Sequence, residues 1–214
     1  WHYQTQHFTD SEAINLPGHP EGEPCTSVED YTDWVRDYVR QKGYHDVVLA
    51  GHSLGGAIVQ LYALKYPEDL KALILVGSGA RLRVHPDYLA LCEQGAKDPE
   101  TWLKNMVEPF YDQVEPDLRE FLLKKQIAVG PTVMLTDFLC CDKFDVMDRA
   151  KEIKLPTLAI CGTEDVMTPV KYAQYFTRNI EGAKEAIIEG ATHHVLLEKP
   201  VEVNRAIEEF LKSL

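Results

Sequence analysis

The chain has 214 residues, of which 45% are hydrophobic and 26% charged, which is enough for one core in one domain. Lys and Arg number 22 against 34 Asp and Glu, so the formal net charge is −12, which argues against nucleic acid and anionic membranes as partners. No apolar run approaches the roughly 20 residues of a membrane span. The first ten residues lack the basic start and apolar stretch of a signal peptide.

The five cysteines are odd in number and show no C-x-x-C spacing, a pattern typical of free thiols in a reducing cytoplasm. The adjacent pair Cys140-Cys141 invites a redox or metal-binding interpretation. Adjacent cysteines rarely form a disulfide, however, and no histidine follows at ligand spacing. We therefore expect structural thiols, no metal and a cytoplasmic location.

The N-terminal part reads as helix and loop before the first clear element. Residues 1–8 indicate the end of a helix or a loop, and Glu12–Leu16 a short strand followed by a turn-rich loop. A helix is predicted from Ser27, whose hydroxyl can cap it with Asp30 three residues on. Gly43 ends this helix.

The next stretch combines a short apolar run, Val47–Ala50, with the pattern G-x-S-x-G at residues 51–55 and a helix to Tyr66. Strand, sharp turn and helix is the context that displays a nucleophilic serine. We expect a strained backbone at Ser53, with Gly51 and Gly55 both required because a Cβ atom there would clash. The alternative is a glycine-rich turn in which the serine only caps the helix.

A second apolar strand, Leu73–Val76, then predicts a parallel sheet with helices on both faces. The following block has no convincing strand and is too long for a simple crossover. It contains amphipathic helical segments at Pro86–Ala96, Glu100–Tyr111, Pro116–Val129 and Thr132–Cys141. We expect an α/β core of residues 1–81 and 145–214, with a helical cap inserted at 82–144.

The α/β alternation returns in the last third, with the strand Thr157–Cys161, the helix Pro169–Asn179, the strand Ala186–Ile188 and a final helix, Val201–Leu214. Chemically suited side chains follow three of the predicted strands: Ser53, Asp165 and His193. Reactive groups gather at the carboxyl ends of strands in open α/β sheets. A serine hydroxyl needs a base, usually histidine, and a carboxylate that orients it. The chain order Ser, Asp, His is that of the α/β-hydrolases.

The chain resembles an α/β-hydrolase-fold enzyme of the capped carboxylesterase type. The matching motifs span nearly everything outside the predicted cap: Leu16-Pro17-Gly18-His19, Gly51-His52-Ser53-Leu54-Gly55-Gly56, Gly162-Thr163-Glu164-Asp165 with Pro169, and Gly190-Ala191-Thr192-His193 with Glu198-Lys199-Pro200.

Two assignments follow from that resemblance. The family places Glu-x-Pro at a fixed distance after its catalytic histidine, and Glu198 begins such a motif at that distance from His193. We therefore favour His193 as the base and expect His194 to be a packing or pocket residue. The position in the loop favours Asp165 as the acid over its competitors, Glu164, Asp145 and Asp148. His52 is expected to pack or hydrogen-bond locally, and His19 to shape its own loop.

The resemblance implies a serine hydrolase that cleaves carboxylic esters through an acyl-enzyme. Ser53 attacks, His193 transfers the proton, Asp165 holds the imidazole, and the backbone N–H of Leu54 binds the oxyanion, without metal or organic cofactor. The apolar cap favours a small, uncharged ester as the partner. Alternatives on this fold are a C–C bond hydrolase, a lactonase, a cofactor-free haloperoxidase and a non-catalytic binding protein.

One departure from the family concerns the second oxyanion donor. In the family it comes from a His-Gly loop after an earlier strand, ahead of the Leu16–His19 motif, and this sequence contains no such loop. Losing one oxyanion donor costs roughly 10²–10³ in kcat. We therefore expect further N-terminal residues, either on this chain or on a cleaved segment that stays bound.

Overall fold

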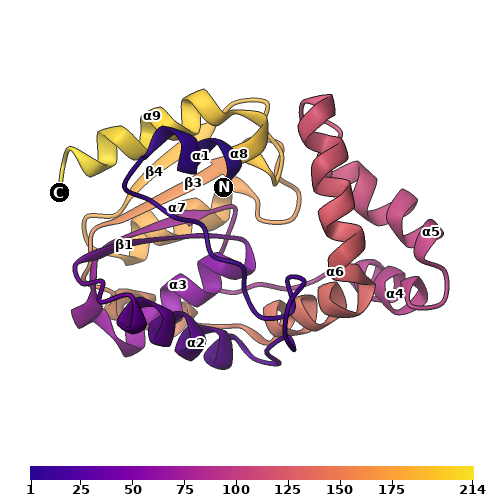
Figure 1. Ribbon diagram of the computed structural model, residues 1–214. Coiled ribbons are helices and arrows are strands. Elements are labelled where there is room, and N and C mark those ends of the chain that lie inside the picture. Colours follow the sequence, from indigo (N-terminus) through magenta and orange to yellow (C-terminus); the bar gives the residue numbers. More distant parts are fainter.

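A parallel four-stranded sheet forms the centre of the computed structural model, which describes all 214 residues. The strands lie in chain order: β1 (Val47–His52), β2 (Leu70–Val76), β3 (Thr157–Gly162) and β4 (Lys184–Ile188). Parallel neighbours require a crossover between each pair, and helices supply most of these connections. The predicted α/β class with a parallel sheet is confirmed (Figure 1).

Helices cover both faces of the sheet because its central strands are apolar on both sides. Leu73 and Leu75 of β2 belong to one core cluster, and Ile74 and Val76 belong to the other. The first face is covered by α2 (Val28–Gln41), α3 (Leu54–Lys65) and α7 (Val170–Asn179). The second face carries α1 (His2–His7), α8 (Val195–Glu198) and α9 (Pro200–Leu211).

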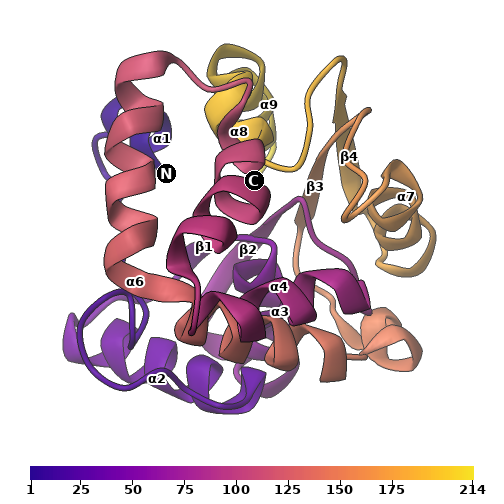
Figure 2. The same ribbon diagram turned by 90° about the vertical axis from the view of Figure 1, so that its right-hand side faces the viewer.

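Between β2 and β3 the chain forms α4 (Pro86–Gly95), α5 (Pro99–Trp102) and α6 (Pro116–Lys143), here called the inserted helices. Figures 1 and 2 show them standing beside the sheet and its covering helices. A π-helical turn and a 3₁₀ turn link α5 to α6 and cover Leu103–Val107 and Glu108–Tyr111.

The helix α6 is broken in the middle, as the two separate segments predicted from the sequence require. Gly130 has φ 82° and ψ 168°, outside the helical region. Pro131 follows, and a proline lacks the N–H that a continuous helix would need. The two halves therefore meet at a kink.

The predicted strand Glu12–Leu16 is wrong. These residues join no ladder, and β1 pairs only with β2. Ile14 and Leu16 instead pack on the cluster under α2 and α3, and Glu12 accepts a hydrogen bond from Tyr38 at 3.2 Å. Side-chain contacts thus hold this segment without strand pairing.

The start of α2 agrees with the sequence: Ser27 accepts a hydrogen bond from the N–H of Asp30 at 3.0 Å. Short 3₁₀ helices occupy Pro67–Asp69 and Met147–Glu152. Among all of the helices, none combines the length and apolar character that crossing a membrane requires.

Candidate active site

Ser53 occupies the sharp turn between β1 and α3. Its φ of 53° and ψ of −115° lie in the left-handed half of backbone space, so the expected strain at this residue is confirmed. The turn is tied to the neighbouring strand, because the Ser53 N–H donates to the carbonyl of Val76 at 3.0 Å. The Ser78 hydroxyl donates to the Ser53 carbonyl at 2.9 Å.

Two glycines allow close packing around the turn at Ser53, here called the elbow. They are not the predicted pair. A Cβ atom on Gly51 would overlap the carbonyl of Gly55, which confirms the prediction for Gly51. A Cβ atom on Gly55 would meet nothing, so that prediction is wrong. Gly56 has the tight position instead, because a Cβ atom there would overlap the Ser78 side chain.

The loops after β3 and β4 bring Asp165 and His193 together. The Asp165 Oδ2 atom accepts a hydrogen bond from His193 Nδ1 at 2.9 Å. Asp165 is 4% exposed and His193 7% exposed, so water competes little for this bond. The sequence placed these two residues at neighbouring strand ends, and the structure joins them directly.

A turn of its own loop fixes the carboxylate of Asp165. Its Oδ1 accepts the backbone N–H groups of Met167 and Thr168 at 2.9 and 2.8 Å, and the Thr168 hydroxyl donates to Oδ2 at 2.6 Å. Burial opposes ionisation, but His193 and these hydrogen bonds outweigh it and lower the pKa of Asp165. Sequence reasoning missed Thr168, although Asp-x-x-Thr is a turn pattern that could have shown it.

The competing acidic residues lie elsewhere. Glu164 and Asp148 are exposed, and no hydrogen bond joins either to His193. Asp145 faces Arg81 and Arg83 at 3.8 and 3.6 Å.

Glu198 holds the loop that carries His193. Its two carboxylate oxygens accept hydrogen bonds from the backbone N–H and the hydroxyl of Thr192, at 2.6 and 2.5 Å. In the sequence analysis, the distance from His193 to Glu198 was used only to identify His193 as the base. These hydrogen bonds give a physical reason for that distance, because the Glu198 carboxylate must reach Thr192, the residue before His193.

His52 packs against the site histidines, as one of the two expectations had it, and its hydrogen bond crosses the site instead of staying local. Its Nε2–H donates to the backbone carbonyl of His193 at 2.8 Å, and the two rings lie 4.7 Å apart. Burial, followed by the charge of His193, lowers the pKa of His52 to about 3. The ring is therefore neutral at neutral pH and acts as a fixed donor.

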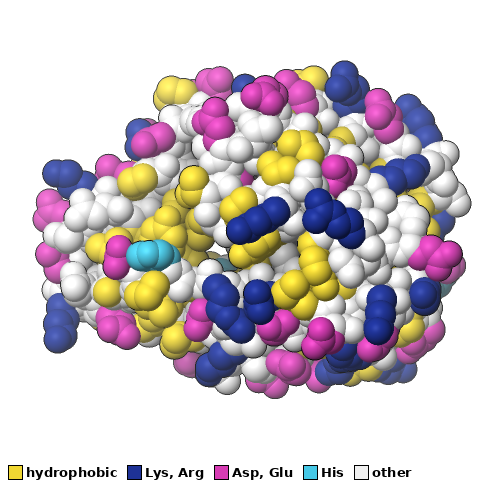
Figure 3. Space-filling view, turned by 180° about the vertical axis from the view of Figure 1, so that it is seen from behind, with side chains coloured by type: hydrophobic (Ala, Val, Ile, Leu, Met, Phe, Trp, Pro, Cys, Tyr) yellow, Lys and Arg dark blue, Asp and Glu magenta, His cyan; other side chains and the backbone are white.

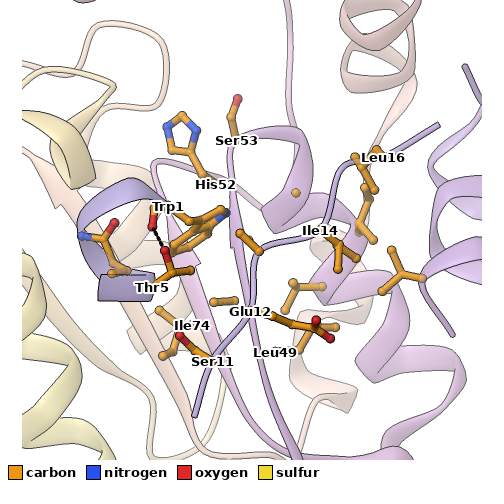
Figure 4. Close-up of a pocket in the computed structure, with 18 of the residues that line it drawn as sticks. Trp1, Thr5, Ser11, Glu12, Ile14, Leu16, Leu49, His52, Ser53 and Ile74 are labelled. Carbon is orange, nitrogen blue, oxygen red and sulfur yellow. Dashed lines mark hydrogen bonds between the residues drawn. The ribbon is translucent and has the colours of Figure 1, made fainter. Parts of the chain in front are cut away.

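A cavity of about 1370 Å³ opens in front of these residues and is lined by Ser53, His193 and His194. Figure 4 shows Ser53 at one end, with Trp1 on one side and Ile14 and Leu16 on the other. The space-filling view shows hydrophobic side chains around a hollow and charged side chains of both signs about it (Figure 3). The N–H of Leu54 is the first amide of α3 and so has no acceptor within the helix.

The inserted helices reach the cavity through Asp137 of α6, which sequence reasoning did not single out. Its carboxylate accepts the Tyr31 hydroxyl at 2.8 Å and contacts His19 Nε2 at 2.8 Å. His19 also bonds to the carbonyl of Pro17 at 3.1 Å, so it shapes its loop as expected. Burial opposes protonation, but the hydrogen bond and charge of Asp137 raise the pKa of His19.

Comparisons with known proteins show the family of the chain. The model of the family described as "Serine aminopeptidase, S33" matches residues 23–200. A putative esterase/lipase of Mycoplasma genitalium is 28% identical over 94% of this chain and 78% of its own. A carboxylesterase of Bacillus subtilis is 27% identical over 85% of this chain and 63% of its own length.

Solved structures show the same fold. The structure described as a thermophilic esterase has a TM-score of 0.83 and 34% identity, covering 99% of this chain and 85% of that one. An enol-lactonase from Burkholderia xenovorans reaches a TM-score of 0.88 at 18% identity, over 99% of this chain and 85% of its own. The fold is that of the α/β-hydrolases.

Proposed function

Because the chain belongs to the serine aminopeptidase (S33) family of hydrolases, we propose that it cleaves small, uncharged carboxylic esters through an acyl-enzyme. The observation that carries the proposal is the buried pair of His193 and Asp165, whose histidine lines the same cavity as the strained Ser53. The esterase names of the similar proteins favour esters over peptides.

In this mechanism Ser53 Oγ attacks the ester carbonyl carbon. Since Nδ1 of His193 is bonded to Asp165, Nε2 is the nitrogen that takes the serine proton and returns it to the leaving alcohol. The depressed pKa of Asp165 keeps it ionised, so it stabilises the imidazolium. The Leu54 N–H, at the positive end of α3, binds the oxyanion. Water then repeats the cycle and releases the acid.

We further propose that residues 82–144 act as a cap that sets the size of the acyl group. Phe110, Met134 and Phe138 of this region line the same cavity as Ser53. These side chains are apolar, and apolar walls favour an uncharged acyl chain.

Hydrolysis of p-nitrophenyl esters of graded chain length, by the wild type and by Ser53→Ala, tests this function. We expect turnover of the short esters by the wild type and its loss in Ser53→Ala, because no other side chain here replaces the nucleophile. The fold should persist, since the substitution removes only a hydroxyl. Turnover retained above a few per cent in a folded Ser53→Ala protein would contradict the assignment.

A further inference from the structure

His194 is the histidine of the site whose hydrogen bonding the protein leaves open. His52 donates to a carbonyl and His193 bonds to Asp165, but neither ring nitrogen of His194 has a partner in the protein. Its Nδ1 atom is fully shielded from solvent. Polar side-chain atoms inside proteins are usually paired, and Nε2, the ring nitrogen that is not shielded, is the one left free for a ligand in the cavity.

The ring of His194 lies between His52 and the 3₁₀ turn Glu108–Tyr111. Its centroid lies 5.3 Å from that of His52, 5.0 Å from Tyr111 and 5.8 Å from Phe110. Burial, followed by the charges of His52 and His193, lowers the pKa of His194 well below its usual value. A neutral imidazole offers one N–H donor and one lone pair.

The surroundings of the two nitrogens decide where the proton sits. A proton on the shielded Nδ1 would bury an unpaired donor, and orphaned donors are rarer in proteins than under-satisfied acceptors. The N–H therefore belongs on Nε2. His194 lines the cavity, and the part of the ring that stays open is the part away from Nδ1.

The charge of the cavity restricts what this donor can meet. No lysine or arginine lines the cavity, whereas Asp10, Glu12, Asp46 and Asp137 do. A carboxylate or phosphate on the substrate would lose water and meet no lysine or arginine there. The pKa of His19 is raised, but this ring already faces the Asp137 carboxylate at 2.8 Å. An uncharged oxygen does not have the desolvation cost of a charged group.

We propose that the Nε2–H of His194 donates a hydrogen bond to a second, uncharged oxygen of the substrate. The enzyme then selects neutral esters with an ether, hydroxyl or keto oxygen near the scissile bond over hydrocarbon esters and over carboxylated ones. This inference rests on the proposed ester hydrolysis.

Isosteric ester pairs test it. Methyl 3-methoxypropanoate and methyl pentanoate differ by one oxygen for one methylene on the acyl side, and 2-methoxyethyl acetate and butyl acetate differ likewise on the alcohol side. Each kcat/KM is divided by the alkaline hydrolysis rate of the ester. In one of the pairs the wild type should favour the ether by about fivefold, the worth of one neutral hydrogen bond.

Variants of His194 assign that preference to the ring. His194→Phe keeps the aromatic packing without the N–H and should lose the preference, whereas His194→Gln returns a donor and should retain part of it. The control is His85→Phe, the same change at an exposed histidine, which should keep the wild-type ratio. If His194→Phe does not fold, His194→Leu takes its place in the same comparison.

The results that overturn the inference differ from those that overturn the function. Equal rates for both members of both pairs in the wild type, or an ether preference that survives in His194→Phe, would refute the role of His194. So would faster hydrolysis of monomethyl succinate than of methyl pentanoate. A wild type that hydrolyses none of these esters refutes the proposed function itself.

Discussion

Two histidine–aspartate pairs in this molecule have nearly the same geometry and different surroundings. His193 and Asp165 meet at 2.9 Å, and His19 and Asp137 at 2.8 Å. A hydroxyl also donates to each carboxylate, from Thr168 in the first pair and from Tyr31 in the second. Asp165 also accepts two backbone N–H groups, and it bonds to Nδ1 of its histidine whereas Asp137 bonds to Nε2.

The pairs differ in burial and in what they connect. The side chains of His193 and Asp165 are 9% and 0% exposed, against 26% and 16% for His19 and Asp137. The first pair joins two loops at the carboxyl ends of adjacent strands. The second joins the loop before α2 to α6 of the inserted helices.

A His–Asp pair becomes a candidate catalytic unit through its position in the fold. The first pair sits at the strand ends beside the elbow that presents Ser53, where its orientation of the imidazole can serve proton transfer. The second pair ties α6 to the core, where its contribution is to hold the inserted helices in place. Substitutions that treat the two pairs alike should therefore have different results.

The largest difference is expected for the carboxylates. Asp165→Asn should lower kcat by about 10⁴-fold, because an amide favours the wrong tautomer of the base. Asp137→Asn should lower kcat on a small acetate ester by less than about tenfold, since the amide oxygen still accepts one hydrogen bond. Steady-state kinetics on p-nitrophenyl acetate measures both. Similar losses in the two variants would contradict the separation of roles.

Substitution of the histidines should likewise lower kcat more in the first pair than in the second. His193→Ala should reduce kcat on the order of 10³-fold or more, because it removes the proposed base, the histidine that is bonded to Asp165. His194→Ala and His19→Ala should cost far less with the same short ester. A greater loss in His194→Ala than in His193→Ala would reverse the assignment of the base.

The pair of His19 and Asp137 should affect the stability of the protein more than it affects turnover. Tyr31→Phe removes a donor to the Asp137 carboxylate and should lower the free energy of unfolding by about 2 kcal/mol. Urea unfolding measures this change, and Tyr38→Phe on the same helix, whose hydroxyl bonds to an exposed carboxylate, is the matched control. An unchanged midpoint in Tyr31→Phe would show that the bond contributes nothing to the fold.

The smallest effect concerns pH. The pKa of His19 is raised by Asp137, so its stabilisation is fully present below the unfolded pKa and is lost as pH rises through the folded one. His19→Gln should therefore destabilise the protein more at about pH 5.5 than at about pH 9, by less than about 1 kcal/mol for this partly exposed pair. A destabilisation that is the same at both pH values would contradict the raised pKa.

Much of the fold and of the candidate site followed from local patterns in the sequence. The apolar run before Ser53 and the helix after it predicted the elbow, because strand, turn and helix leave their marks within a few residues. The strand ends likewise predicted that Asp165 and His193 would share one edge of the sheet.

What the sequence did not predict depends on contacts between distant segments. His19 and Asp137 are separated by 118 positions, and nothing near either residue indicates the other. The need for glycine at Gly56 rather than Gly55 depends on which side of α3 faces Ser78. The segment Glu12–Leu16, predicted as a strand, instead packs through Ile14 and Leu16 on the core under α2 and α3.

Covalent labelling tests the central claim most directly, because a fluorophosphonate reacts only with an activated serine. After reaction with wild-type protein and proteolysis, mass spectrometry should find the phosphonyl group on the peptide that contains Ser53. Labelling should disappear in Ser53→Ala and slow strongly in Asp165→Asn, while Asp137→Asn should label as fast as the wild type. A label on another serine, or equal labelling rates in Asp165→Asn and the wild type, would contradict the account.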